Sequence, residues 1–365
     1  MVTEVIKIDR DHPDMSAFEK AGRILKEGGL VAFPTETVYG LGADALDEEA
    51  SRKIYEAKGR PSDNPLIVHI ARMEDLEKIV KKVPEEAVKL AQRYWPGPMT
   101  LIMEKSECVP YGTTGGLDTV AVRMPSDPVA RELILQGGGY VAAPSANTSG
   151  RPSPTTARHV YEDMEGKIPL ILDGGPVEIG LESTIVDLTE RIPTILRPGY
   201  ITLEMVREVL GEVQMDKGLI SSDSSVRPKA PGMKYRHYAP KADLKIVEGP
   251  MEKVIAYINE KASEKKRPGI ICTEETRSRY LYGDVKCIGS RTDENAIASH
   301  LFAILREFDE DGVDAIYSES FESPGLGQAI MNRLLKAAGH QRVEDRKSTR
   351  LNSSHHQVSR MPSSA

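Results

Sequence analysis

Cysteine is scarce in this sequence, and the few cysteines lie far apart. There are three in 365 residues, Cys108, Cys272 and Cys287, and none belongs to a C-x-x-C pair. An odd, scattered set provides neither a disulfide framework nor the closely spaced ligands of a structural zinc site. Such usage is typical of the reducing cytosol, and we expect a cytoplasmic protein.

Long apolar runs and an excess of positive charge are also missing. The N-terminal stretch MVTEVIKIDRDHPDM is charged throughout, unlike a signal peptide, and no segment approaches the roughly 20 apolar residues of a membrane helix. Lys and Arg number 48 against 55 Asp and Glu, a net charge of −7. We therefore expect no membrane partner and no surface that binds nucleic acid as a whole, while a local basic groove stays open.

The common nucleotide and metal motifs are absent as well. No phosphate-binding G-x-x-x-x-G-K-[ST] loop occurs, and Gly325-Leu326-Gly327 lacks the third glycine of a dinucleotide fingerprint. The eight histidines do not cluster at metal-ligand spacing. The sequence thus predicts no protein-built metal site, and a bound nucleotide would have to be held by other means.

Helical and strand periodicities alternate over residues 1–211. Predicted helices cover residues 16–26, 47–57, 73–80, 85–93 and 155–163, and predicted strands cover residues 30–33, 66–70, 101–104, 119–123, 140–144, 170–173 and 184–188. Alternation of this kind indicates an α/β fold. We expect one domain here, a twisted mixed sheet flanked by helices.

A second α/β pattern follows a stretch without periodicity. Residues 212–241 are rich in Ser, Pro, Lys and Gly and are expected to form a linker, although their aromatic and basic end suggests more than a spacer. In residues 242–343, predicted strands at 244–247, 269–272, 285–288 and 314–317 alternate with predicted helices at 251–265, 294–308 and 328–338. This pattern is typical of a small Rossmann-like parallel α/β domain. Residues 344–365 are polar, Ser-rich and foreign to that pattern, and we expect a disordered, non-native tail.

Six segments bring small, hydroxyl or cationic residues to the ends of predicted strands. They are FPTETVYGLG (33–42), KGRPSDNP (58–65), LIVHI (66–70), TVAVRMP (119–125), VAAPSANTSGRPS (141–153) and STIVD with LRPG (183–199). Each has an ordinary explanation in a turn, a helix cap or a solvated sheet face. Together they favour a concave anion-binding site at the edge of one sheet.

Four cationic or imidazole side chains in these segments have more than one interpretation. Lys58 and Arg60 flank a glycine after a predicted helix and would attract phosphate or carboxylate, but a basic helix end explains them equally well. Arg123 shares a strand face with Thr119, and its planar fork fits a carboxylate; a solvated face is the alternative. A lone histidine in a strand, such as His69, is more typical of a half-buried residue than of a ligand.

The order and wording of several segments resemble the threonylcarbamoyl-adenylate synthase family, whose catalytic domain is YrdC-like. The segments are PTETVYGLG, KGRPSDNPLIVHI, WPGPMTL, TVAVRMP, APSANTSGRPSPT, STIVD and ILRPG, within about residues 24–199. The later PGMKYRHYAP and the second α/β pattern resemble the longer, two-domain branch of the family, to about residue 338. The tail stands where the family's final strand would lie, so we expect the last element of the second domain to be disturbed.

The resemblance also implies a set of site residues. The K-x-R and S-x-N signature of the family corresponds to Lys58, Arg60, Ser145 and Asn147, with Lys58 and Arg60 as the catalytic pair on the phosphates. Threonine would be bound by Thr37, His69, Arg123, Ala143 and Ser183. ATP would contact Lys58, Arg60, Asn64, Thr119, Ser145, Asn147, Ser153, Arg197, Tyr235 and His237, with Tyr235 closing over the nucleotide from the linker.

The implied activity is the synthesis of threonylcarbamoyl-AMP and pyrophosphate from L-threonine, bicarbonate and ATP, the first step of threonylcarbamoyladenosine modification of tRNA. Mg²⁺ would enter through the ATP phosphates, and a tRNA threonylcarbamoyl transferase would take up the product. The main alternative is a tRNA-binding module without turnover, against which the acidic balance and the 5% aromatic content count. A carbamoyltransferase subunit would need further domains, and an independent nucleotide site in the second domain would need the missing glycine. A weak tRNA contact by the synthase stays open.

Overall fold

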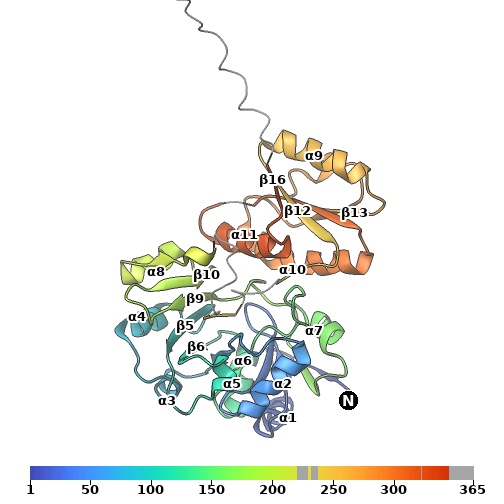
Figure 1. The fold of residues 1–365 in the computed structure, drawn as a ribbon. Helices are drawn as coiled ribbons and strands as arrows, with labels where there is room; N and C mark the ends of the chain where they lie inside the picture. Colours follow the sequence, from blue (N-terminus) through green and yellow to red (C-terminus); the bar gives the residue numbers. More distant parts are fainter. Residues whose placement is uncertain (220–228, 232–236, 322, 345–365) are drawn as a thin grey trace, which may run out of the picture.

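The computed structural model describes residues 1–219, 229–231, 237–321 and 323–344, which form two α/β bodies that lie against each other (Figure 1). The larger body contains the N-terminus, and the smaller body follows the segment around residue 240. The two parts have separate sheets. We describe the larger body first because its strand ends position the site.

Residues 1–219 contain an 11-stranded mixed sheet in the order β1-β8-β2-β3-β7-β4-β6-β5-β9-β10-β11. The strands are β1 (Glu4–Lys7), β2 (Val31–Phe33), β3 (Gly40–Asp44), β4 (Ile67–His69), β5 (Met99–Glu104), β6 (Thr119–Arg123), β7 (Val141–Ala142), β8 (Leu170–Asp173), β9 (Thr184–Asp187), β10 (Thr194–Arg197) and β11 (Gln214–Met215). The helices are α1 (Met15–Lys26), α2 (Glu48–Lys58), α3 (Leu76–Ile79), α4 (Glu85–Tyr94), α5 (Tyr111–Thr114), α6 (Pro128–Gln136), α7 (Ala157–Met164) and α8 (Leu203–Leu210). The expectation of a mixed sheet flanked by helices is confirmed.

Helices cover both faces of this sheet, and a separate apolar core fills each side. On one face, Phe18 of α1 and Leu133 of α6 are buried against the strands. On the other face, Ile54 of α2 and Leu90 of α4 belong to the larger core. Because the sheet is covered on both sides, ligands can approach the strands only at their ends.

The end of α2 places two cations at the site. The helix begins after Asp47, whose side chain accepts a hydrogen bond from the Glu49 amide. It ends at Gly59, which adopts the left-handed conformation with φ 60°. Lys58 is therefore fixed in the last helical turn, while Arg60 begins the following loop.

Two neighbouring parallel strands end side by side at the site. In the register of β4 and β6, His69 lies opposite Arg123. Strand β7 runs antiparallel to β4, and the amide of Ala143, just beyond β7, donates to the carbonyl of Ile67 at 2.9 Å. The three strands together bring His69, Arg123 and Ala143 to one region of the sheet.

Residues 237–321 and 323–344 contain a five-stranded parallel sheet in the order β14-β13-β15-β12-β16. Its strands are β12 (Asp243–Glu248), β13 (Pro268–Cys272), β14 (Asp284–Cys287), β15 (Ala315–Glu319) and β16 (Arg342–Glu344), and its helices are α9 (Met251–Ser263), α10 (Glu294–Asp311) and α11 (Leu326–Ala337). The expected parallel α/β body is confirmed. Helix α9 lies on the outer face, whereas α10 and α11 face the larger body (Figure 1). Among the described residues, no helix combines the length and apolar character that a membrane crossing requires.

Strand β3 was not predicted, because its sequence GLGAD has the glycines of a turn. In the structure it pairs between β2 and β7. A Cβ atom at Gly42 would lie 2.9 Å from side-chain atoms of both Phe33 and Val141. The glycine therefore permits close packing inside a strand rather than a turn. Helices α5, α6 and α8 and strands β1, β10 and β11 were also missed, and β11 lies within the segment expected to have no regular structure.

The expectation that the last element of the second domain is disturbed is wrong. Strand β16 pairs with β12 in parallel, with Ile246 opposite Arg342 and Val247 opposite Val343. Residues 342–344 thus complete the sheet edge before the Ser-rich segment begins. Residues 345–365 lie outside the described residues, so the expectation of a disordered tail stays a prediction.

Candidate active site

A polar pocket lies where the ends of β4 and β6 meet the loops after β2 and β7. Its lining includes the cations Lys58, Arg60, Arg123, Arg151 and Arg197, whereas Glu182 is the one carboxylate among the described lining residues. The remaining lining is largely small, hydroxyl or amide-bearing. Such a composition favours an anionic ligand.

Arg123 is held rigidly at the end of β6. It is buried, and it donates to the Glu36 carboxylate at 2.6 Å and to the Thr37 hydroxyl at 2.9 Å. Glu36 Oε2 is buried without a hydrogen-bond partner among the described atoms. The guanidinium is thus fixed in one orientation beside the pocket, as a receptor for a planar carboxylate would be.

His69 and Ala143 form the floor next to Arg123. His69 Nδ1 lies 3.0 Å from the Ile67 carbonyl, and the ring meets Phe33 edge to face. Burial, together with repulsion by Arg123, lowers the pKa of His69 to about 3. His69 is therefore neutral at physiological pH, and Ala143 next to it is small enough to leave room for a ligand.

Ser183 and Arg197 also line the pocket. The Ser183 hydroxyl lies 2.7 Å from Thr100 Oγ1 and accepts a hydrogen bond from Arg197 Nη2 at 3.1 Å. Arg197 also donates to the Ser183 carbonyl at 3.0 Å. Burial lowers the pKa of Arg197 to about 10. Arg197 remains a cation at neutral pH, and its hydrogen bonds to Ser183 fix its position.

Lys58 is buried and points toward the loop that follows β7. Its ammonium donates to the carbonyl oxygens of Ser145 and Asn147. Burial and the nearby Arg60 hold the pKa of Lys58 well below its usual value. The ammonium, which has three donors, also donates to Asn147 Oδ1 over a longer distance of 3.5 Å. An anionic ligand would replace this weaker contact, and its charge would favour the protonated form.

Arg60 and Asn64 belong to one short loop. Arg60 donates to the carbonyls of Asn64 and Pro65 at 3.1 Å each, and its guanidinium lies 5.9 Å from the centroid of the Tyr55 ring. Burial lowers the pKa of Arg60 to about 10. The Asn64 side chain is buried, and neither of its polar atoms has a partner among the described atoms. Asn64 supports Arg60 through its backbone but does not itself line the pocket.

The loop of residues 145–153 crosses the pocket next to Lys58, and we call it the SxN loop. Asn147 Oδ1 accepts from the Ser145 hydroxyl, and Asn147 Nδ2 donates to the carbonyls of Thr148 and Arg151 at 2.9 and 3.0 Å. The Ser153 hydroxyl donates to Glu182. All three predicted side chains of this loop line the pocket.

The segment around residue 238 closes the pocket from the side of the smaller body. Pro231, His237 and Tyr238 line the pocket, and Ala239 donates to the Gly150 carbonyl at 2.8 Å. Tyr238 has a positive φ of 63°, a conformation that costs a non-glycine residue about 1 kcal/mol or more. Its buried ring stacks on Phe302 of α10 at 5.0 Å. Tyr235 lies outside the described residues.

Besides Asn64, Thr119 is the described residue of the predicted set that does not line the pocket. It begins β6, opposite Glu104 of β5, roughly 13 Å along the strand from Arg123 at the usual rise per residue. The prediction missed Glu36 and Glu182, although both stand beside predicted residues in PTETVYGLG and LESTIVD. A carboxylate next to a threonine or serine is the signal that could have identified them.

Within the described residues, no three His, Cys, Asp or Glu side chains are arranged to hold a metal ion. Two carboxylates lie near the site, Glu182 in the pocket lining and Glu36 beside Arg123, and each forms an ion pair with an arginine. Glu36 pairs with Arg123, and Glu182 pairs with Arg333 at 2.8 Å. Burial raises the pKa of Glu182, but Arg333 and Arg197 outweigh that effect and leave the pKa below its usual value. Both carboxylates thus balance arginines rather than offering a cation site.

Two family models match the chain, one after the other. A model described as telomere recombination matches residues 23–199, and a model described as the C-terminal domain of threonylcarbamoyl-AMP synthase matches residues 201–339. The first match lies within the larger body, and the second covers the end of that body, with α8 and β11, and most of the smaller body. Both parts of the chain therefore have known relatives.

Several relatives are similar to the chain over nearly its whole length. Threonylcarbamoyl-AMP synthase of Pyrococcus abyssi is 52% identical over 324 residues, covering 89% of this chain and 94% of the relative. The enzyme of the same name from Bacillus subtilis is 51% identical over 321 residues, with 88% and 92% covered. A crystal structure of P. abyssi Sua5 in complex with L-threonine superimposes with a TM-score of 0.88 at 48% identity, covering 94% of this chain and 99% of that chain.

Proposed function

The chain belongs to the threonylcarbamoyl-AMP synthase family, and we propose that its cationic pocket condenses L-threonine, bicarbonate and ATP into threonylcarbamoyl-AMP and pyrophosphate. The observation that supports this proposal most strongly is that one pocket contains two halves with different sets of side chains. One half presents the rigid guanidinium of Arg123 beside small and hydroxyl groups, and the other presents Lys58 and Arg60 beside the SxN loop. The first suits an amino acid and the second a polyphosphate.

The reaction joins these halves in two steps. The unprotonated amine of threonine forms an N–C bond to CO2 derived from bicarbonate and loses a proton, giving a carbamate. A carbamate oxygen then attacks the α-phosphorus of ATP, the bond to the β-phosphate oxygen breaks, and pyrophosphate leaves. Neither step needs a covalent enzyme intermediate. The protein contributes mainly positioning and charge stabilisation.

On the threonine side, we assign the carboxylate to Arg123 and the hydroxyl and amine to Thr37, Ser183 and their surroundings. His69 beside Arg123 is neutral, so Arg123 is the cation that the carboxylate would meet there. The small side chain of Ala143 leaves room for the amino acid. The related Sua5 of P. abyssi has been crystallised in complex with the same amino acid.

On the ATP side, we assign the phosphates to Lys58 and Arg60 and the remaining nucleotide contacts to Ser145, Asn147, Ser153, Arg197 and His237. Lys58 already binds the backbone of the SxN loop, so phosphate binding and loop position are coupled. Asn64 would act by supporting Arg60. Thr119 and Tyr235 keep their proposed ATP role only as predictions, since the first lies away from the pocket and the second lies outside the described residues.

Among the described residues, the two carboxylates nearest the site, Glu36 and Glu182, each pair with an arginine. We propose that the ion enters with ATP on its phosphate oxygens. When bound, it would neutralise charge on the leaving pyrophosphate. The residues of this chain that would face the same phosphates are Lys58 and Arg60.

We further propose a catalytic domain of residues 1–211 and a second domain of residues 242–343, joined by a linker of residues 212–241. The start of this linker forms β11 and pairs with β10 of the catalytic sheet, and its end, around residue 238, would cover the site. The contact of Ala239 with Gly150 and the pocket-lining His237 and Tyr238 support a covering role. The labile product would pass to a tRNA threonylcarbamoyl transferase in the cytoplasm. A weak direct contact with tRNA is compatible with this scheme.

Pyrophosphate release tests the proposal, measured with and without L-threonine and with and without bicarbonate. We expect release that requires both. Lys58→Ala removes a phosphate donor and frees two loop carbonyls, and it should lower kcat/KM for ATP by more than about 100-fold. The exposed Lys20→Ala is the control, since Lys20 pairs with Glu4 on the surface. Salt-sensitive tRNA binding without pyrophosphate release would instead favour the binding module.

A further inference from the structure

Two arginines of the smaller body are buried against the larger one. Arg306 of α10 is 1% exposed and Arg333 of α11 is 0% exposed. Arginine is seldom buried so completely unless its charge and its donors are satisfied. The partners of both guanidinium groups lie next to the pocket.

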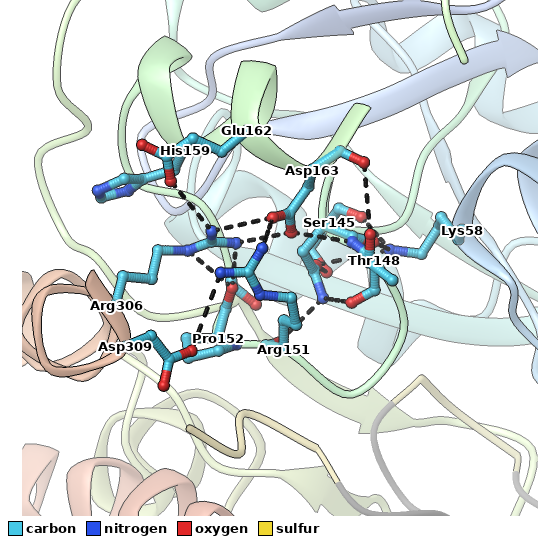
Figure 2. Close-up of polar contacts among 12 residues, drawn as sticks. Lys58, Ser145, Thr148, Arg151, Pro152, His159, Glu162, Asp163, Arg306 and Asp309 are labelled. Carbon is cyan, nitrogen blue, oxygen red and sulfur yellow. Dashed lines mark hydrogen bonds and ion pairs between the residues drawn. The ribbon is translucent and has the colours of Figure 1, made fainter. Parts of the chain in front are cut away.

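Arg306 holds the outer side of the SxN loop (Figure 2). Its Nε and Nη2 donate to the Pro152 carbonyl at 3.2 and 2.7 Å, and Nη2 also donates to Asp163 at 2.9 Å. Asp163 in turn accepts from the Thr148 amide at 3.0 Å and pairs with Arg151. One buried arginine therefore fixes both ends of residues 148–152.

Lys58 holds the same loop from the other side. Its ammonium binds the carbonyls of Ser145 and Asn147, which precede the segment held by Arg306. In Figure 2, Lys58 and Arg306 lie on opposite sides of this segment. The loop is thus held between one cation of each body.

Arg333 holds the end of the loop through Glu182. Its Nε donates to Glu182 Oε2 at 2.8 Å, and its Nη1 donates to the Pro198 carbonyl at 2.7 Å. The other carboxylate oxygen of Glu182 accepts from Ser153. Arg333 consequently fixes Ser153 and the residue that follows Arg197.

Apolar contacts hold the two bodies in this arrangement. Val38 and Leu181 of the larger body are buried in the same core as Leu301 and Phe302 of α10. Val38 directly follows Thr37, and Leu181 precedes Glu182 and Ser183. The core of the smaller body thus extends under the loops of the pocket.

We propose that the second domain orders the nucleotide half of the site, and that Arg306 and Arg333 are positioning residues for the SxN loop. This inference rests on the proposed function in taking ATP as the ligand of that loop. The guanidinium groups act on backbone carbonyls and carboxylates rather than on substrate. Loss of either should weaken ATP binding. Loss of Arg306 should also leave the threonine half, built around Arg123, in place, whereas Arg333 donates to the Glu182 carbonyl directly before Ser183 and so contacts both halves.

The test compares Arg306→Lys and Arg333→Lys with the control Arg158→Ala. Lysine keeps the charge but cannot reach a carbonyl and a carboxylate with one planar group. Arg158 forms an exposed ion pair with Glu310 between α7 and α10, the same helices that Asp163 and Arg306 join. The control therefore removes an exposed contact between the same two helices, and the loss of this contact should change substrate affinity little.

We expect each lysine variant to raise the KM for ATP and the dissociation constant of α,β-methylene-ATP at least tenfold. Threonine affinity should stay within threefold of the wild type in Arg306→Lys. Hydrogen exchange at residues 145–153 should rise in parallel, and Arg158→Ala should change neither affinity by more than twofold. ATP affinity within twofold in both folded lysine variants would overturn the inference. An equal loss of threonine and ATP affinity in Arg306→Lys would also overturn it, as a general structural effect.

Two further measurements keep the test decisive. If Arg306→Lys does not fold, Asp163→Asn replaces it, because that change removes the anion and keeps the shape; the same affinity pattern is expected. If the wild type binds α,β-methylene-ATP but releases no pyrophosphate, the proposed function fails, and the affinity pattern still decides the inference. If the wild type does not bind the nucleotide analogue, the inference is overturned as well.

Discussion

Replacing Arg123 with lysine tests the threonine half of the site at the side chain on which it depends most. Arg123 is fixed by Glu36 at 2.6 Å and by Thr37 at 2.9 Å, so its guanidinium faces the pocket in one orientation. Arg123→Lys keeps a cation opposite Glu36 and should leave the fold intact. The ammonium is a point charge and cannot present two parallel N–H groups to a carboxylate.

The expected rise in the KM for threonine follows from the loss of one charge-assisted hydrogen bond to the threonine carboxylate. Such a bond contributes about 1.5–3 kcal/mol, and about 1.36 kcal/mol corresponds to a factor of ten. The KM for threonine should therefore rise roughly 10- to 150-fold. The KM for ATP should stay within about threefold, because Lys58 and Arg60 are untouched.

The assay is steady-state pyrophosphate release with threonine varied at saturating ATP and bicarbonate, supported by calorimetric titration of threonine. Arg52→Lys serves as the control, since Arg52 lies on the surface of α2 and pairs with Glu49 and Glu56. A threonine KM within twofold of the wild type in a folded Arg123→Lys variant would remove Arg123 from the carboxylate role.

Two other predictions concern stability. The pKa of His69 lies near 3 in the folded chain and about 6.5 in an unfolded one, so only the unfolded chain binds this proton as the pH falls, and the folded state loses stability from pH 6.5 toward pH 3. In urea unfolding between pH 6 and 4.5, the free energy of unfolding of His69→Gln should therefore fall less steeply with pH than that of the wild type, by about 1.4 kcal/mol per pH unit. Equal slopes in the two proteins would contradict the argument from burial. Gly180 and Gly175 both have a positive φ, +81° and +83°, but a Cβ atom at Gly180 would lie 2.5 Å from Ser299 Cα, whereas Gly175 has open space around it. Gly180→Ala should therefore lower the free energy of unfolding, measured with denaturant, by about 1–3 kcal/mol more than Gly175→Ala does. Equal losses would mean that α10 does not pack tightly against this segment.

Much of the pocket could be predicted because its residues stand at strand ends with a recognisable order. His69 and Arg123 follow apolar strand runs, and the structure places them opposite each other in β4 and β6. Lys58 and Arg60 follow a helix end marked by glycine. Such strand and helix ends can be predicted from the sequence, because they depend on residues that are close together in the chain.

Glycine-rich strands and contacts between the two bodies could not be predicted in the same way. The GLGAD strand has the composition of a turn, and only its packing against Phe33 and Val141 explains why glycine is required at residue 42. Arg306 and Arg333 stand in amphipathic helices, where a charged residue ordinarily faces solvent. Their burial arises from another part of the chain, about 150 residues away in sequence, and no local pattern encodes it.

The most direct test of the central claim follows the carbon of bicarbonate into the product. The protein is incubated with ¹⁴C-bicarbonate, L-threonine and ATP, and the nucleotide products are separated at once. We predict a labelled species that contains both threonine and AMP, formed in equal amount to pyrophosphate. An unlabelled threonine–AMP adduct would mean that the threonine carboxylate itself attacks ATP, and this outcome would contradict both the carbamate route and the assignment of the carboxylate to Arg123.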